Sequence, residues 1–438
     1  MRIKLLCHAS VLISTEDCVV MADPWFVGGA FNDSWSLWPA PAVSHEDMDA
    51  TTHLYISHEH PDHFHFPTLK SLPAEFKSRV NVIFQYNNSN KVTDALKKLG
   101  FSKFTVVKHR HTVEISPKTQ AYVYQQGLMN SGLGLISGGQ KVFNINDAEF
   151  SHRDCQIISK DIGTWDVVLN QFSMAGYGGN PNRAATLTKA ASRILGTMME
   201  NHRDLGAKAT IPFASFIYFS TIYNSYMNEF GNKPRTVHQA FQGAGLTANI
   251  LYPGDTWDLN QPDYDSESAL SRFDQSETEL QAVQLRVPTP IPLEAIESSF
   301  QKLAKHLKAH YGALLLSMLK PVVIRIPDIN QTIRIHIRSA SFERLDANQD
   351  PELEIDSDAL NFAFSWPWGV QTLGVSARAT VFKNIRNWKF HRAIFALNNA
   401  EIYTKGKQLF TSRNMEFFKT RFTGSVNQLF HQLKRMEG

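Results

Sequence analysis

A histidine-rich loop at residues 58–65 holds the side chains of this sequence that are best suited to chemistry. His58 and His60 lie two residues apart, and Asp62 and His63 follow directly. In extended backbone, side chains two residues apart project to the same side, so the two rings can face one point. Imidazole nitrogen and carboxylate oxygen together suit zinc, iron or manganese. The loop therefore predicts a site for one or two transition-metal ions.

The histidine loop follows a short apolar segment, residues 52–57, which is typical of a buried strand. Sheets of α/β proteins usually present ligand-binding groups at the carboxyl ends of their strands, and the loop begins at such an end. His65 continues the run where a helix can begin, and we interpret it as structural. His152 lies in a polar segment and could supply a further metal ligand, but we favour its interpretation as a solvated loop residue.

Strand signals dominate the first third of the chain. Short β-branched segments at residues 2–6, 10–14 and 18–22 precede the loop, whereas the first long helical pattern appears only at residues 182–206. A turn at Gly138–Gly139 indicates a hairpin. Many strands ahead of the first long helix favour an α/β protein in which two sheets are sandwiched between helices.

The composition limits which kinds of partner and which cellular compartment we expect. The formal net charge is only +3, and no block of lysine and arginine occurs. We therefore expect a small-molecule substrate and no nucleic-acid partner. No apolar run approaches the roughly 18 residues of a membrane span. The three cysteines form no CxxC pair or disulfide framework, which fits a reducing compartment. We therefore expect a cytoplasmic protein.

The His-x-His-x-Asp-His spacing at residues 58–63 resembles the signature of the metallo-β-lactamase superfamily. Segments 7–14 and 22–35 are similar to the opening of the branch with lactonase-like and sialic acid hydroxylase-like members. Segments 211–230 and 251–257 resemble the catalytic domain of the CMP-N-acetylneuraminate hydroxylase group. The resemblance covers roughly residues 1–260 and implies an αββα sandwich with one or two metal ions at a sheet edge.

The resemblance also nominates residues outside the loop. Asp147, in the segment at 146–150, matches the acidic residue that bridges or completes the metal site, so the expected ligands are His58, His60, Asp62, His63 and Asp147. His8 and Asp23 lie near strand ends, and we expect them to orient the ligand histidines. Members that hydroxylate carry a Rieske cluster held by two cysteines and two histidines, and this chain has no such set. The electrons would then have to come from elsewhere, either from an external donor or from the substrate itself.

The chain is long enough for two domains. A polar stretch leads into the proline-rich segment 287–292, which cannot continue a helix or pair as a central strand. We expect a catalytic domain at residues 1–260, a linker at 261–290 and a smaller α+β domain at 291–438. In this last domain the pattern predicts an amphipathic helix at residues 293–312, a hairpin at 322–337, short strands up to about residue 402 and a helix after Asn414. The domain resembles, weakly, the sterol-carrier-like domains, and we leave open packing, homo-oligomer formation or covering the active site as its role.

Three functions are consistent with these features. The first is a non-heme iron oxygenase acting on a small polar molecule, with iron favoured over zinc or manganese because of the resemblance. The second is a zinc-dependent hydrolase of a lactone, amide or phosphodiester, in which Asp62 or Asp147 orients a metal-bound water as the catalytic residue. The third is a metal-binding protein without catalysis.

Overall fold

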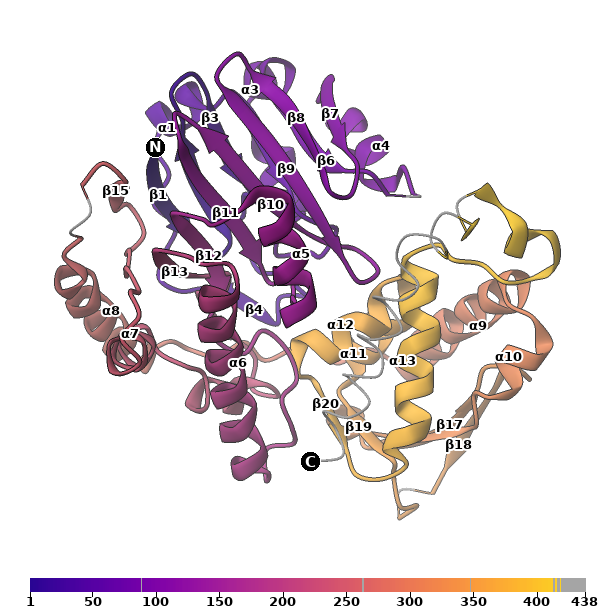
Figure 1. Ribbon diagram of the computed structural model, residues 1–438. Helices are drawn as coiled ribbons and strands as arrows, with labels where there is room; N and C mark the ends of the chain where they lie inside the picture. The colour runs from indigo at the N-terminus through magenta and orange to yellow at the C-terminus, as the bar shows by residue number, and fades with distance from the viewer. Residues whose placement is uncertain (88, 262–263, 347, 413, 416–417, 419–438) are drawn as a thin grey trace.

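The computed structural model describes residues 1–87, 89–261, 264–346, 348–412, 414–415 and 418. The N-terminal domain contains a pair of sheets that face each other (Figure 1). The first has seven strands in the order β15 (Thr256–Asp258), β1 (Arg2–Cys7), β2 (Ser10–Ser14), β3 (Val19–Ala22), β5 (His53–Ile56), β6 (Asn81–Gln85) and β7 (Lys103–Val107). The second has six in the order β13 (Ala209–Phe213), β12 (Val167–Gln171), β11 (Gln140–Asn146), β10 (Asn130–Ser137), β9 (Thr119–Gln126) and β8 (His111–Ser116). A further pair joins β14 (Ile217–Phe219) to β4 (Trp35–Leu37).

Strand β5 shows why the sheets are stacked. Tyr55 belongs to the apolar core between the two sheets, whereas Leu54 and Ile56 belong to the core beneath the helices. Successive side chains of a strand point to opposite faces, so a strand that is apolar at every position must be covered on both sides. The helices outside the first sheet are α1 (His45–Ala50), α2 (Phe66–Ser71), α3 (Ala74–Arg79) and α4 (Lys91–Lys98).

The second sheet is covered by α5 (His152–Ile162), whose Cys155 and Ile158 pack on Phe143 and Ile145 of β11. The long helix α6 (Ala184–Asp204) follows β12. This arrangement of helix, sheet, sheet and helix confirms the predicted α/β class and its αββα sandwich (Figure 1).

Helix α5 corrects one interpretation. His152 is not a loop residue: it begins the helix, and its Nδ1 lies 2.7 Å from Oδ2 of Asp204. Ser151 and Asp154 form a capping box, in which each side chain accepts a hydrogen bond from the other residue's backbone N–H. This pair was visible in the sequence and would have marked the start of the helix.

The turn between β10 and β11 matches the predicted hairpin. Gly138 and Gly139 have φ angles of 55° and 77°, and two consecutive positive φ angles characterise the tight turn that suits the twist of a hairpin. From this turn β11 extends alongside β10 to its end at Asn146. The position of the hairpin therefore determines where the next residue, Asp147, lies.

The helices α7 (Pro234–Gly243) and α8 (Ser266–Leu280) complete the N-terminal domain. Helix α8 occupies half of the segment expected as a linker, yet Ala269, Leu270 and Phe273 are buried in the core between the sheets and these helices. The helix therefore packs within the first domain, and the chain leaves that domain only after residue 280.

The C-terminal domain has its own apolar core around a five-stranded sheet. The strands follow the order β18 (Ser341–Leu345), β17 (Gln331–His336), β16 (Val322–Ile326), β19 (Leu353–Ile355) and β20 (Ala379–Val381). The helices are α9 (Leu293–His310), α10 (Ala313–Ser317), α11 (Ser357–Ser365), α12 (Gly369–Ser376) and α13 (Ile385–Asn399). The expected amphipathic helix and the hairpin of β16 and β17 are both present.

Short strands were also expected up to about residue 402, and this was wrong for most of the segment. Asp356 accepts a hydrogen bond from the backbone N–H of Ala359 and so caps α11. Three helices then occupy most of residues 357–399. The helix expected after Asn414 falls mainly outside the described residues.

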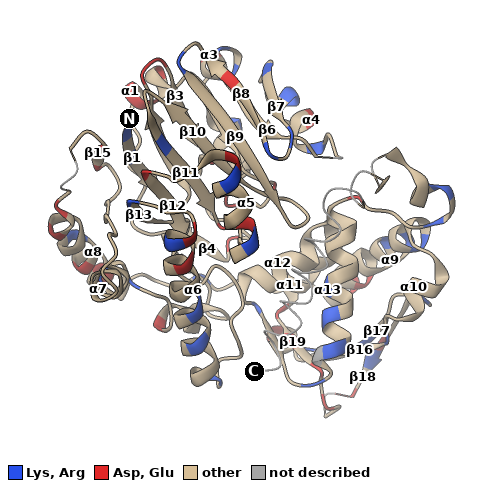
Figure 2. Ribbon diagram, in the orientation of Figure 1, with Lys and Arg blue, Asp and Glu red and all other residues tan. Residues whose placement is uncertain are grey.

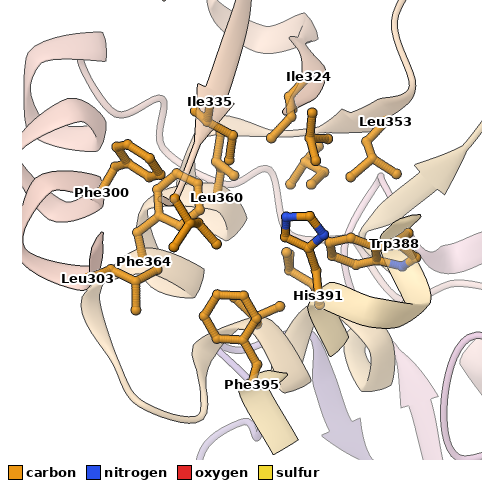
Figure 3. Close-up of a pocket in the computed structure, with 15 residues that line it drawn as sticks. Phe300, Leu303, Ile324, Ile335, Leu353, Leu360, Phe364, Trp388, His391 and Phe395 are labelled. Atoms are coloured by element: carbon orange, nitrogen blue, oxygen red, sulfur yellow. The ribbon is translucent and has the colours of Figure 1, made fainter. Parts of the chain in front are cut away.

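A small cavity lies inside this second core (Figure 3). Aliphatic and aromatic side chains line it, with His391 among them, and Nδ1 of His391 lies 2.9 Å from the backbone oxygen of Asn387. No residue of the histidine loop contributes to its wall. The cavity therefore belongs to the packing of the C-terminal core and not to the candidate metal centre.

Acidic and basic residues are spread along the ribbon of both domains (Figure 2). Across the described residues, no helix combines the length and the apolarity that crossing a lipid bilayer requires.

Candidate metal centre

Three strand ends and one turn meet at one edge of the sandwich. β5 leads into the histidine loop, β3 leads into Asp23 and β11 leads into Asp147, whereas His8 lies in the turn between β1 and β2. β3 and β5 are parallel neighbours, so their carboxyl ends share an edge. Hydrogen bonds and short contacts connect the side chains that gather there, which are His8, Asp23, His58, His60, Asp62, His63 and Asp147.

One group of candidate ligands consists of two histidines and one carboxylate. Oδ2 of Asp147 lies 3.6 Å from Nε2 of His58 and 3.5 Å from Nε2 of His63. Four ligands at about 2.1 Å from a tetrahedral ion are separated by about 3.4 Å. The two distances to Asp147 therefore match those between ligands of one metal ion, and all three atoms lie within 4.8 Å of one another.

His60 lies beside this group. Its Nδ1 is 2.8 Å from Nε2 of His58, and the two rings meet edge to face with their centroids 4.5 Å apart. Phe31 approaches the His60 ring from the side, at a centroid distance of 6.2 Å. The nitrogen atoms of His58 and His60 therefore face each other, and His60 as a metal ligand stays a prediction.

A second group contains His8, Asp62 and His63. Oδ2 of Asp62 lies 3.1 Å from Nε2 of His8 and 3.2 Å from Nε2 of His63. His63 belongs to both groups, so the two sets of donors are adjacent.

Asp23 holds His63 in place from behind. Its Oδ2 accepts a hydrogen bond from Nδ1 of His63 at 2.9 Å and another from the amide of Asn146. Ser57 donates its backbone N–H to Oδ1 at 2.8 Å and its hydroxyl to Oδ2 at 2.6 Å. Because a carboxylate requires a donor, the proton of a neutral His63 lies on Nδ1, and Nε2 is left with its lone pair toward the cluster.

Asp23 and Asn146 have φ angles of 39° and 64°, a region in which residues other than glycine are uncommon. Both residues directly follow, or end, a buried strand, and their side chains bond to each other. The two unusual backbone conformations therefore occur where two strand ends from different sheets are joined beneath the histidines.

Burial and the neighbouring carboxylates set the protonation of the imidazoles. Burial lowers the pKa of His58 well below its usual value and lowers the pKa of His8 as well. Burial acts in the same sense on His63, but the charges of Asp62 and Asp147 raise its pKa well above the usual value. His58 and His8 are therefore neutral near pH 7, whereas His63 would release a proton when a cation binds.

The two carboxylates are held in their ionised form. Burial by itself raises the pKa of Asp62, but His63 and His8 outweigh it and the pKa lies well below its usual value. Asp147 is only half-buried, and His58 and His63 hold its pKa below the usual range. Ionised carboxylates and neutral imidazoles are the forms that bind metal ions.

Several buried polar atoms of the cluster lack a hydrogen-bond partner within the part of the chain that the structure describes, and a bound cation would supply their missing interaction. Oδ1 of Asp62, Oδ1 of Asp147 and Nε2 of His63 are buried without a hydrogen-bond partner among the described residues. Buried polar atoms without partners are rare in folded proteins, and a bound ion can satisfy them. The donor set, entirely nitrogen and oxygen, fits iron, zinc or manganese.

Aromatic side chains line the inner side of the cluster. Trp25 and Trp35 are almost fully buried and meet the His8 ring edge to face at centroid distances of 5.6 and 6.4 Å. Trp25 also stacks on His65, at 5.4 Å. These rings exclude water from one side of the candidate ligands, and the sequence offered only the tryptophan close to Asp23 as a hint.

His65 has the structural role that we expected for it. It is the N-cap of α2, with Nδ1 accepting the backbone N–H of Thr68, and its Nε2 lies 3.2 Å from the backbone oxygen of Gly29. Both ring nitrogens are therefore engaged, and His65 is not among the candidate ligands.

The C-terminal domain contacts the loop that supplies the aromatic residues. Arg378 is buried in an ion pair with Asp356, and it also donates to Ser34 in the loop after β3, at 3.4 Å. Asn32, in the same loop, donates to Asp358 at 2.9 Å. On the other side of the site, Lys91 pairs with Glu59 of the histidine loop at 2.6 Å and donates to the backbone oxygen of Asn399. The second domain thus touches segments on both sides of the cluster.

Residues 2–151 match the family described as beta-lactamase superfamily domain. This region of the chain is a metallo-β-lactamase-fold domain, and the candidate ligands lie at the edge of its sandwich.

Several known proteins are similar to the chain. One, from Mycolicibacterium smegmatis and provisionally named a Rieske 2Fe-2S iron-sulfur protein, is 32% identical over 188 residues, which are 40% of this chain and 35% of that protein. Another, the cytidine monophosphate-N-acetylneuraminic acid hydroxylase of Asterias rubens, is 39% identical over 72 residues, or 16% of this chain and 11% of the hydroxylase. The matched regions therefore span about a third or less of these relatives. Among solved structures, CmlA, a diiron beta-hydroxylase from Streptomyces venezuelae, is 17% identical with a TM-score of 0.42, over 58% of this chain and 53% of that one.

Proposed function

We propose that this protein is a metal-dependent oxygenase that hydroxylates a small polar molecule and takes its electrons from a separate donor. The observation that carries the proposal is the group of His58, His63 and Asp147 within ligand reach of one another. Two histidines and one carboxylate with open positions are the ligand set of non-heme iron oxygenases. The similarity to a hydroxylase and to a Rieske-type iron-sulfur protein supports the same class.

Iron in such a ligand set supplies the activation of dioxygen. The protein has three tasks around it, which are to hold the metal, to orient its ligands and to exclude water. His58, His60, His63, Asp62 and Asp147 would hold the metal.

Asp23 and Ser57 fix the ring of His63, and the backbone oxygen of Ser57 in turn accepts hydrogen bonds from Gln85 at 2.6 Å and Ser131 at 2.7 Å. Two sheets thereby support the start of the histidine loop. Trp25 and Trp35 keep one side dry, which strengthens the electrostatic interactions of the ligands.

A separate donor belongs to the proposal because the described cysteines offer no cluster site. Cys7, Cys18 and Cys155 are all buried and unpaired, and burial raises the pKa of Cys7 to about 12. Thiols of this kind are poor metal ligands. Buried reduced cysteines also support a cytoplasmic location, which we include in the proposal.

A zinc-dependent hydrolase is the second candidate, and the match to a beta-lactamase superfamily domain favours it. Zinc in the same ligands would supply hydrolytic chemistry. Asp62 and Asp147, with an unbonded Oδ1 each, would orient a water or accept its proton. A metal-binding protein without catalysis is the third candidate.

Metal analysis of protein purified without added metal separates the three. We expect iron, together with oxygen consumption that depends on a chemical reductant or a Rieske-type ferredoxin with its reductase. Zinc accompanied by cleavage of lactone or phosphodiester test substrates would replace the oxygenase by the hydrolase. A protein that binds neither metal at micromolar concentration would refute both enzymatic candidates.

A further inference from the structure

His8 occupies an unusual position for a histidine. It lies in the turn between β1 and β2, is fully buried, and its backbone oxygen accepts a hydrogen bond from the N–H of Ala214 at 2.9 Å. Ala214 directly follows β13 of the second sheet. The turn is therefore held between the edges of both sheets, and this places the imidazole inside the candidate metal centre.

The side chain meets the cluster through Asp62. Oδ2 of Asp62 lies between Nε2 of His8, at 3.1 Å, and Nε2 of His63, at 3.2 Å. All three ligand atoms lie within 4.8 Å of one another. The two distances to Asp62 are close to the roughly 3.4 Å between ligands of a tetrahedral ion, so the three atoms are near enough to share one ion.

The candidate ligands form two sets of three, one set for each ion, only when His8 is included. Nε2 of His63 belongs to both groups, but its single lone pair can bind one ion. If His63 binds the ion next to Asp62, then His60 takes its place at the other ion, and His58, His60 and Asp147 again supply two histidines and one carboxylate there. Without His8, the ion at Asp62 would have only two side-chain donors of its own.

We infer that His8 is a direct ligand of a second metal ion, which it binds together with Asp62 and His63. This inference rests on the proposed metal-dependent function and adds a ligand from outside the histidine loop. The ion would be of the same kind as the first, a divalent iron, zinc or manganese, because the donors are again two imidazoles and a carboxylate.

The competing interpretation is that His8 only donates a hydrogen bond to Asp62 and so orients it. His8→Gln distinguishes the two, since the glutamine amide N–H₂ can reach a position like that of Nε2 and donate to Asp62, yet it is a poor ligand for these metals. His8→Ala removes both roles. His202→Gln is the matched control, because His202 is also buried, bonds to Thr210 at 2.8 Å, and belongs to neither ligand group.

The experiment measures bound metal per chain by elemental analysis, after anaerobic titration with Fe²⁺ and, separately, with Co²⁺, whose visible bands report its ligands. We expect two ions in the unmodified protein and in His202→Gln, but one in His8→Gln and His8→Ala. Two ions in His8→Gln, with affinity within threefold of the unmodified protein, would overturn the inference and leave the proposed function intact. No metal in the unmodified protein would instead refute the proposed function.

Should the His8 variants fail to fold, crystals of the unmodified protein grown with Co²⁺ provide a second test. Anomalous scattering should place an ion about 2.1 Å from Nε2 of His8. Ions located only among the other histidines would overturn the inference.

Discussion

Replacing Asp23 by asparagine should weaken metal binding without touching a metal ligand. The carboxylate of Asp23 accepts hydrogen bonds from Ser57, His63 and Asn146. An asparagine side chain has one acceptor oxygen and one N–H₂ group, so at least one of these donors would face another donor. The lost acceptor is also the group that keeps the proton of His63 on Nδ1.

The expected magnitude follows from that loss. A hydrogen bond to a charged group contributes about 1.5–3 kcal/mol. If about 2 kcal/mol of that is lost from the orientation of His63, the metal affinity falls about thirtyfold, since a factor of ten corresponds to about 1.4 kcal/mol. This lies within the range of roughly 10–100-fold that is typical when a residue behind a ligand histidine is changed.

The assay is a competition titration of Zn²⁺ or Fe²⁺ against a chromophoric chelator. Asp47→Asn is the control, because Asp47 is nearly buried, accepts a backbone N–H in the capping box of α1 and pairs with Lys4, but bonds to no histidine of the site. We expect the control to retain its affinity. An affinity of Asp23→Asn within twofold of the unmodified protein would refute the reasoning that Asp23 orients His63.

Three further changes have expected outcomes. Asp147→Ala should lower metal content to one ion or less per chain, because it removes the carboxylate between His58 and His63; elemental analysis checks this, and unchanged content would exclude Asp147 as a ligand. Arg378→Met should destabilise folding by about 3–5 kcal/mol in urea unfolding, because it leaves Asp356 buried without its charge partner; a loss below about 1 kcal/mol would contradict a stabilising buried ion pair. Burial lowers the pKa of His391, so below its unfolded value of about 6.5 the unfolded state binds more protons and stability falls with falling pH. His391→Leu should therefore reduce the difference in unfolding free energy between pH 7.5 and 5.5, and an unchanged difference would show that His391 does not carry it.

Local patterns predicted the elements that carry the site. The short β-branched segments, the two glycines at 138 and 139, and the histidine spacing all depend on neighbours in the chain, and the structure shows the sheets, the turn and the clustered rings. Helix α5 was missed although Ser151 and Asp154 offered a local signal. The helices between residues 357 and 399 were missed because their apolar faces can be recognised only once the core that they cover is known.

The sequence by itself determined that His58, His60, Asp62 and His63 lie together, since six residues cannot place them far apart. Only the tertiary structure decided that Asp23, Asn146 and Asp147 meet them, and that His8 turns toward Asp62. Those residues come from different strands and from two sheets, and their proximity depends on which strands pair and how the sheets stack. Strand pairing and stacking are settled by burial across the whole core, which no short segment of the chain contains.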